Sequence, residues 1–183
     1  IQKDTYIIMR IKSLTIYCSS SNNLDIEFYD LAKNLGKFMA KKSIKVIYGG
    51  GSIGLMGELS KSAYSSGGEV IGIIPDFLVN KEIQNNQITE TIVVKNMHDR
   101  KKKLFELGDG FLILPGGSGT VEEATEVISW KFLDLNNKKI IIFNYKGYWN
   151  NLFKMYQIAN DKVFGNKNLQ NICEHIKTIQ EFK

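Results

Sequence analysis

The sequence predicts an α/β domain built on a parallel β-sheet that is covered by helices on both faces. Short runs of β-branched residues alternate with segments of helical periodicity along most of the 183 residues. Runs such as KVIY and VIGII are apolar at consecutive positions, which is typical of strands buried on both faces. Two glycine-rich stretches directly follow such runs and open helical segments. These features favour a Rossmann-like arrangement, in which ligands bind at the carboxyl ends of the strands.

The elements are expected in the following order. Strands are predicted at residues 14–18, 45–48, 70–74, 91–94, 110–114 and 140–143. Helices are predicted at residues 26–39, 55–64, 97–107, 120–135 and 148–159. Residues 76–90 are polar and fit neither period, so we expect an excursion between two halves of the sheet. Near the C-terminus we expect a short strand at residues 172–175 and a closing helix from Thr178.

Length and composition indicate one ordinary globular domain. A chain of this size supports one substantial core, so a single domain over residues 1–183 is expected, with residues 1–8, which precede Met9 as the expected natural start, outside the fold. The apolar fraction is 43% and the charged fraction 23%, as in soluble proteins. No run approaches the roughly 18 apolar residues that span a bilayer, and the N-terminus lacks a secretory signal pattern. We therefore expect a cytoplasmic protein without a membrane partner.

Charge and ligand chemistry argue against several function classes. The net charge of +5, from 24 basic and 19 acidic side chains, is modest for a nucleic-acid binder, so no nucleic-acid partner is expected. Cys18 and Cys173 lie far apart in apolar contexts and are expected to be reduced. The only histidines are His98 and His175, which leaves no ligand set for a metal centre.

The first glycine-rich loop, YGGGSIGLMG, follows the second predicted strand. Gly49, Gly51 and Gly54 fit the G-x-G-x-x-G spacing of dinucleotide sites, and Gly51 is a candidate substrate contact. The next strand ends in Ile-Ile-Pro, however, where a dinucleotide fold would place an acidic residue for the ribose. A P-loop fails as well, because no Gly-Lys-Ser/Thr follows the glycines. The alternative is that these glycines permit a tight turn and close helix–strand packing.

The second glycine-rich loop, ILPGGSGTVEEATE, is the predicted phosphate site. Gly116, Gly117 and Gly119 let the backbone approach a ligand closely, and Ser118 and Thr120 add hydroxyl groups at the start of a helix. Backbone N–H groups and the helix dipole favour an anion there. An alternative concerns the spacing Thr-x-x-Glu from Thr120 to Glu123, which matches a capping box in which the glutamate bonds back to the helix start. On spacing alone the two roles are equally supported.

Charged residues near this loop suggest the chemistry. Glu123 and Glu126 form an acidic edge on the helix, which can stabilise positive charge on a reacting sugar, position water or orient a basic partner. That partner is expected to be Arg100 in MHDRKKKLF, since it shares the inward side of its helix with Met97. Lys101 lies beside that side and could reach phosphate as a point charge.

A third loop, CSSSNN, places Ser19, Ser20 and Ser21 at the end of the first predicted strand. Serines in this position can cap the next helix or bind phosphate or ribose hydroxyls, and both roles stay open. Ser20 is our candidate substrate contact in this loop.

Taken together, YGGGSIGLMG, MHDRK and PGGSGTVEE resemble the LONELY GUY family of cytokinin riboside 5′-monophosphate phosphoribohydrolases over about residues 11–159. The resemblance implies that Arg100 and Glu123 are catalytic and that residues 117–123 bind the nucleotide. It also places Glu82, Lys101 and Ser129 on substrate-contacting positions. The sequence departs from the family pattern at Ser129, where threonine is frequent, and at Ser19, where glycine is usual.

The resemblance implies hydrolysis of the N-glycosidic bond of an N6-substituted adenosine 5′-monophosphate by a homodimer without a cofactor. The alternatives are an AMP nucleosidase, a broader nucleotide phosphoribohydrolase, or a carrier that binds a nucleotide or cofactor without turnover. The family is often labelled lysine decarboxylase-like. That chemistry generally needs a lysine-bound pyridoxal cofactor, and nothing in the sequence marks a Schiff-base lysine with its accessory groups.

Overall fold

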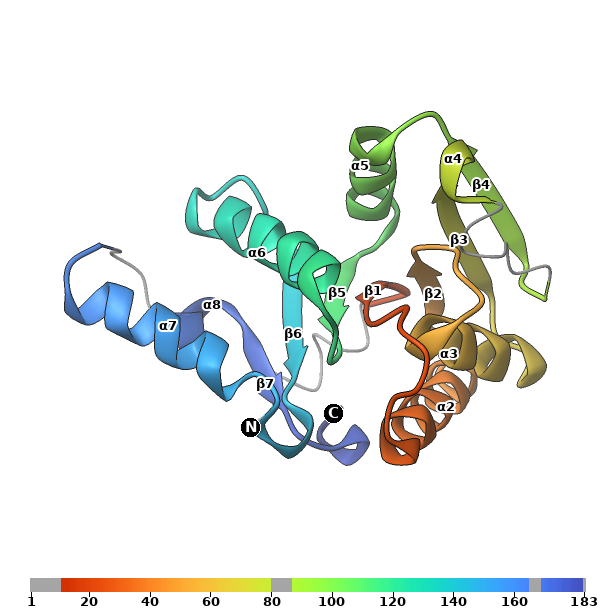
Figure 1. Cartoon of the computed structure of the whole chain (residues 1–183), viewed down its shortest axis with the longest axis horizontal. Coiled ribbons are helices and arrows are strands. Elements are labelled where there is room, and N and C mark those ends of the chain that lie inside the picture. The colour runs from red at the N-terminus through yellow and green to blue at the C-terminus, as the bar shows by residue number, and fades with distance from the viewer. Residues whose placement is uncertain (1–10, 80–86, 165–168, 183) are drawn as a thin grey trace.

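The computed structural model describes residues 11–79, 87–164 and 169–182 (Figure 1). Its centre is a seven-stranded sheet with the order β4-β3-β2-β1-β5-β6-β7, and every pair of neighbouring strands is parallel. The strands are β1 (Ser13–Tyr17), β2 (Lys45–Tyr48), β3 (Val70–Pro75), β4 (Glu90–Val94), β5 (Gly110–Ile113), β6 (Lys139–Phe143) and β7 (Glu174–Ile176). The expected parallel α/β architecture is confirmed.

Helices cover both faces of this sheet. They are α2 (Ile26–Lys41), α3 (Gly54–Ser65), α4 (Asp76–Val79), α5 (Met97–Leu107), α6 (Ser118–Phe132), α7 (Asn150–Asp161) and α8 (Leu169–Ile172), with short 3-10 helices at η1 (Tyr145–Gly147) and η2 (Ile179–Glu181). Figure 1 shows α2 and α3 together at one end of the view and α6 and α7 together at the other. Among the described residues, no helix is long and apolar enough to cross a membrane.

Alternating side chains of the central strand contact the two helical layers. Leu14 and Ile16 of β1 pack into a core shared with α2 and α3. Tyr17 belongs to a second core with residues of α5 and α6, and the Thr15 hydroxyl donates to the Leu104 carbonyl of α5 over 2.6 Å. A strand buried on both faces needs apolar residues at consecutive positions, which explains the uninterrupted apolar runs of the sequence.

The strand order creates a switch point beside β1. The chain builds β1 to β4 outward in one direction, and α5 then returns it to β5 on the other side of β1. Tyr17 is therefore level with Ile113, and the Ser19 N–H donates to the Pro115 carbonyl over 3.2 Å. Ligands of open α/β sheets bind where the order reverses in this way. The serine loop and the second glycine loop thus meet at one place.

Three expectations about the chain path need correction. Residues 76–90 do not connect two halves of the sheet, because β3 and β4 are direct neighbours and the crossing to the other half follows β4. Pairing partners are set by tertiary packing, which local periodicity does not contain. The expected strand at residues 172–175 is shifted: α8 extends through Ile172, and β7 begins at Glu174. The closing helix is only the short η2, which starts after Thr178.

Candidate active site

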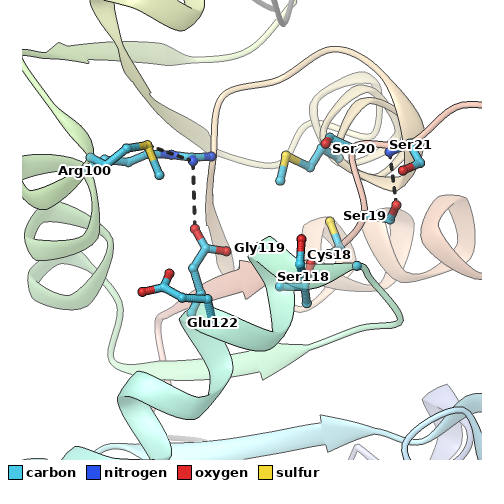
Figure 2. A pocket seen from close by; sticks show the side chains of 13 residues that line it. Cys18, Ser19, Ser20, Ser21, Arg100, Ser118, Gly119 and Glu122 are labelled. Carbon is cyan, nitrogen blue, oxygen red and sulfur yellow. Dashed lines mark hydrogen bonds and ion pairs between the residues drawn. The ribbon is translucent and has the colours of Figure 1, made fainter.

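A cavity of about 230 Å³ opens at the switch point (Figure 2). Its walls come from the end of β1, the first turns of α3 and α5, and the start of α6. The lining residues are Cys18, Ser19, Ser20, Ser21, Met56, Met97, Arg100, Gly117, Ser118, Gly119, Thr120, Glu122 and Glu123. Figure 2 shows Arg100 reaching from one side of the cavity, with the serine loop on the other side and the start of α6 below.

The start of α6 offers backbone donors to this cavity. Gly117 is the N-cap residue, and the Val121 N–H makes the first intrahelical bond to the Gly117 carbonyl over 3.0 Å. The N–H groups of Ser118, Gly119 and Thr120 precede that bond and therefore lack an intrahelical acceptor. Together with the helix dipole they form an environment that favours an anion.

The glycines of this loop leave room in front of those donors. A Cβ atom added at Gly117 or Gly119 would meet no heavy atom within 4 Å among the described residues. Gly117 also has an ordinary negative φ of −83°, so its backbone conformation does not require glycine. At Gly116, in contrast, a Cβ would lie 2.1 Å from the Thr120 hydroxyl oxygen. Gly116 is needed by the fold, whereas Gly117 and Gly119 keep the cavity open.

The capping-box alternative for Glu123 is wrong. The helix starts at Ser118, two residues earlier than expected, so Thr120 is inside the first turn and not at the N-cap. Glu123 lies in the next turn with its side chain only 8% exposed. It is therefore unable to cap the helix start, and it faces the cavity instead.

Arg100 and Glu123 form a buried pair across the cavity. The Arg100 Nη1 and Glu123 Oε1 atoms are 3.9 Å apart, and the arginine side chain is 6% exposed. Arg100 is held from behind, because Nε donates to the Ile73 carbonyl over 3.2 Å and Nη2 to the Gly49 carbonyl over 3.1 Å. The guanidinium edge that remains points towards the cavity and the carboxylate. A buried arginine stays charged, so this geometry fixes a cation beside Glu123.

Tyr17 and Cys18, at the end of β1, keep their protons at neutral pH. Burial, and next the Glu123 charge, raise the pKa of the Tyr17 hydroxyl well above its usual value. The same two causes raise the pKa of the Cys18 thiol far out of its usual range. Because a thiol needs its ionised form to attack, Cys18 is unsuited to be a nucleophile although it lines the cavity.

Lys101 lies outside the cavity lining and bridges two helices. Its Nζ atom is 2.6 Å from Glu122 Oε1 and 3.0 Å from Glu126 Oε1. The hydrogen bond to Glu122 is the largest cause of a raised pKa of Lys101. A Schiff-base lysine needs the opposite shift, towards the neutral amine. Lys101 therefore ties α5 to α6 in this structure.

The first glycine loop interlocks with the serine loop. The Ser19 carbonyl accepts from the N–H groups of Leu55 and Met56 over 2.9 and 3.2 Å. These backbone donors at the start of α3 are therefore bonded within the protein. Gly54 has a φ of +62°, and a Cβ there would come within 2.8 Å of the backbone of residues 19–21. The packing interpretation of this loop is therefore supported, and the helix start that would hold a pyrophosphate is occupied by the chain itself.

The structure brings most of the predicted site residues together. Seven of them line the cavity: Ser20, Arg100, Gly117, Ser118, Gly119, Thr120 and Glu123. Gly51 is buried outside the lining, and Ser129 is exposed farther along α6. Gly116 lines an adjacent cavity of about 210 Å³, which shares Ser19, Ser21 and Gly117 with the first. Glu82 falls outside the described residues.

The sequence analysis does not identify several side chains near the site, among them Met56, Met97 and Tyr148. Met56 and Met97 line the cavity, and a single methionine in a helical pattern gives no signal that separates a pocket wall from the core. The Tyr148 hydroxyl donates to the Gly116 carbonyl over 2.8 Å and so anchors the second glycine loop. This contact joins segments 32 residues apart, which no local pattern records.

Comparisons with known proteins match this architecture. A family model described as "Possible lysine decarboxylase" matches residues 56–182. A rice protein (Oryza sativa subsp. japonica) named "Probable cytokinin riboside 5′-monophosphate phosphoribohydrolase LOGL6" is 38% identical over 155 residues, which cover 85% of this chain and 62% of the rice protein. The cytokinin riboside 5′-monophosphate phosphoribohydrolase of Rhodococcoides fascians is 39% identical over 149 residues, 81% of this chain and 75% of that protein.

A solved structure supports the fold independently. The molybdenum cofactor carrier protein of Chlamydomonas reinhardtii has a TM-score of 0.68 to this chain at 17% identity, covering 93% of this chain and 92% of that protein. Identity at that level carries the fold alone. The sequence relatives carry the family: this chain belongs to the cytokinin riboside 5′-monophosphate phosphoribohydrolase family.

Proposed function

We propose that this protein hydrolyses the N-glycosidic bond of N6-substituted adenosine 5′-monophosphates and releases the free base and ribose 5-phosphate. The observation that carries the proposal is the buried Arg100–Glu123 pair, 3.9 Å apart, in a cavity that is also lined by the first residues of α6. A phosphate at the helix start and a carboxylate one turn further along suit a ribose 5-phosphate group whose anomeric carbon faces Glu123.

The chemistry follows from the charges of the site. The bond between the anomeric carbon and the base nitrogen breaks, water adds its hydroxyl to that carbon, and the base takes up a proton. Positive charge develops on the sugar ring as the bond breaks. The Glu123 carboxylate stabilises that charge or activates the water, and Arg100 places a fixed positive charge beside the carboxylate. The phosphate contacts hold the sugar in the orientation that the reaction requires.

A comparison of three substrates tests the proposed preference for N6-substituted nucleotides. Release of free base is measured side by side from N6-isopentenyladenosine 5′-monophosphate, from AMP and from the isopentenyl riboside without phosphate. We expect the substituted nucleotide to be cleaved fastest, and the riboside at least about 100-fold more slowly because it lacks the group bound at α6. Faster cleavage of AMP would replace the substrate assignment with a general nucleosidase, and equal cleavage of the riboside would remove the phosphate site.

We further propose that the protein forms a homodimer through α6 and α7. Leu133, Leu135, Met155 and Ile158 are 67%, 70%, 54% and 45% exposed, and the rings of Phe132 and Tyr156 join the two helices with centroids 6.0 Å apart. Leu133 and Leu135 follow directly after α6, and Met155 and Ile158 lie on α7. Exposed apolar side chains are typical of surfaces that bind a partner. A second copy of this chain is the partner we assign.

The dimer is tested by light scattering coupled to gel filtration. Wild type is expected to have twice the chain mass, and the double variant Leu133→Glu/Leu135→Glu the mass of one chain, because charges resist burial in an apolar interface. Ile26→Glu, at a 74% exposed position on α2, is the matched control and should stay dimeric. A monomeric wild type at micromolar concentration would contradict the proposal.

We also propose a cytoplasmic location. Both Cys18 and Cys173 are buried free thiols, which suits a reducing compartment. Fractionation of cells that produce the protein tests this assignment, and recovery in a secreted fraction would overturn it.

A further inference from the structure

The position of Arg100 depends on a narrow gap at the end of β2. Its guanidinium lies against the backbone at Gly49, where Nη2 donates to the Gly49 carbonyl over 3.1 Å. A Cβ atom added to Gly49 would lie 2.0 Å from Nη2 and 3.1 Å from Cζ of Arg100. No real Cβ atom approaches another heavy atom so closely without a bond, so any side chain at this position displaces the guanidinium.

Gly49 has no backbone reason to be glycine. Its φ lies outside the left-handed region, unlike that of the next residue, Gly50, whose φ is +80°. Apart from Arg100, the nearest atom to an added Cβ is the terminal methyl of Met56 at 3.3 Å, which is the far end of a flexible side chain. The space beside Gly49 is therefore occupied by the Arg100 guanidinium.

We infer that Gly49 is a positioning residue for Arg100: its missing side chain and its carbonyl, together with the Ile73 carbonyl, form a seat that aims the guanidinium at Glu123. Two carbonyl acceptors fix the guanidinium plane from behind, which leaves Nη1 directed towards the carboxylate at 3.9 Å. The consequences for catalysis rest on the proposed function, whereas the seat itself does not.

A double-mutant cycle on thermal stability tests the seat without any assay of activity. Gly49→Ala in the wild-type background is expected to lower the Tm by roughly 5 °C, because a buried cation loses its carbonyl partner. In an Arg100→Ala background, or in Arg100→Met if the alanine variant folds poorly, the same change should lower the Tm by less than about 1 °C, since no clash remains. Equal losses in both backgrounds would overturn the inference.

Kinetics supply the functional half of the test. Gly49→Ala should lower kcat for the nucleotide by roughly 100-fold through misplacement of Arg100, with little change in KM because the start of α6 is untouched. Gly49→Ala should have no further effect once Arg100 is replaced. Gly67→Ala, at an exposed turn with a φ of +80°, controls for lost stability and should retain wild-type kcat.

The stability test and the kinetic test can fail independently of each other. A wild-type protein without glycosidase activity would remove the proposed function, yet the stability cycle would still decide whether Gly49 seats Arg100. A normal kcat in Gly49→Ala, from an active wild type, would show that the seat does not position a catalytic arginine.

Discussion

Three glycines of the second loop lack side chains for two different reasons. Gly116 makes room for Thr120, whereas a Cβ at Gly117 or Gly119 would project into open space at the start of α6. The sequence alone gives no reason to distinguish these three glycines. Only the arrangement of neighbouring atoms separates a glycine that the fold requires from a glycine that leaves room for a ligand.

Gly117→Ala is expected to weaken substrate binding without unfolding the protein. The new methyl group fits the backbone but occupies space in front of the N–H groups of α6, so KM for the nucleotide should rise by about 10-fold or more through loss of a charge-assisted hydrogen bond. Steady-state kinetics on the phosphorylated substrate measure this effect, and an unchanged Tm confirms the fold. A KM within twofold of that of wild type would argue against phosphate at this place.

At the scale of elements, the sequence contained most helix and strand positions but not their partners. The apolar run over residues 70–74 predicts a strand, but no local pattern indicates that Glu90–Val94 pairs with it at the sheet edge. The sequence predicts a helix from residue 120, whereas α6 begins at Ser118. Thr120 and Glu123 fit the spacing of a capping box, but the actual N-cap is Gly117 without a side-chain bond. The role of Glu123 depended on that boundary.

Close packing of α2 against α3 gives a prediction at the same scale. A Cβ at Gly36 would lie 2.5 Å from the Leu59 carbonyl oxygen and 2.8 Å from the Ala63 nitrogen, and both are backbone atoms that cannot move independently. Glycine to alanine within a helix usually stabilises by up to about 1 kcal/mol. Here the sign should reverse, with Gly36→Ala losing about 1–3 kcal/mol of unfolding free energy by overpacking.

Urea unfolding at neutral pH measures this difference. A variant as stable as wild type, or more stable, would show that the two helices separate easily and that their contact does not constrain the loops of the site.

For the whole molecule, buried thiols predict how stability changes with pH. Burial raises the pKa of Cys173 from 9.0 to about 12. The unfolded chain therefore loses this proton first, and the free energy of unfolding should fall as pH rises from 9 towards 12. The contribution is roughly 1 kcal/mol between pH 7 and pH 10.

Comparison with Cys173→Ala isolates this contribution from those of other groups. Urea unfolding of both proteins at pH 7 and pH 10 should show a larger alkaline loss in wild type. Equal losses in the two proteins would mean that the thiol ionises freely in the folded state.

The whole fold also shows where sequence reasoning about the site stops. Arg100 could be singled out because it shares the inward side of its helix with Met97, and Glu123 because it lies on an acidic edge beside the second glycine loop. The family resemblance points to both residues. Gly49 and Tyr148, which hold Arg100 and the glycine loop, act through contacts between distant segments. Such contacts follow from strand order, and strand order is a property of the assembled sheet.

Free-base release by wild type and by Glu123→Gln, with N6-isopentenyladenosine 5′-monophosphate as substrate, tests the central claim most directly. The amide keeps the shape of the side chain but removes the charge beside Arg100, so we predict that kcat falls at least about 100-fold while calorimetry still detects nucleotide binding. Glu106→Gln, an exposed change on α5, serves as the matched control and should behave as wild type. Undiminished base release by Glu123→Gln would contradict the account.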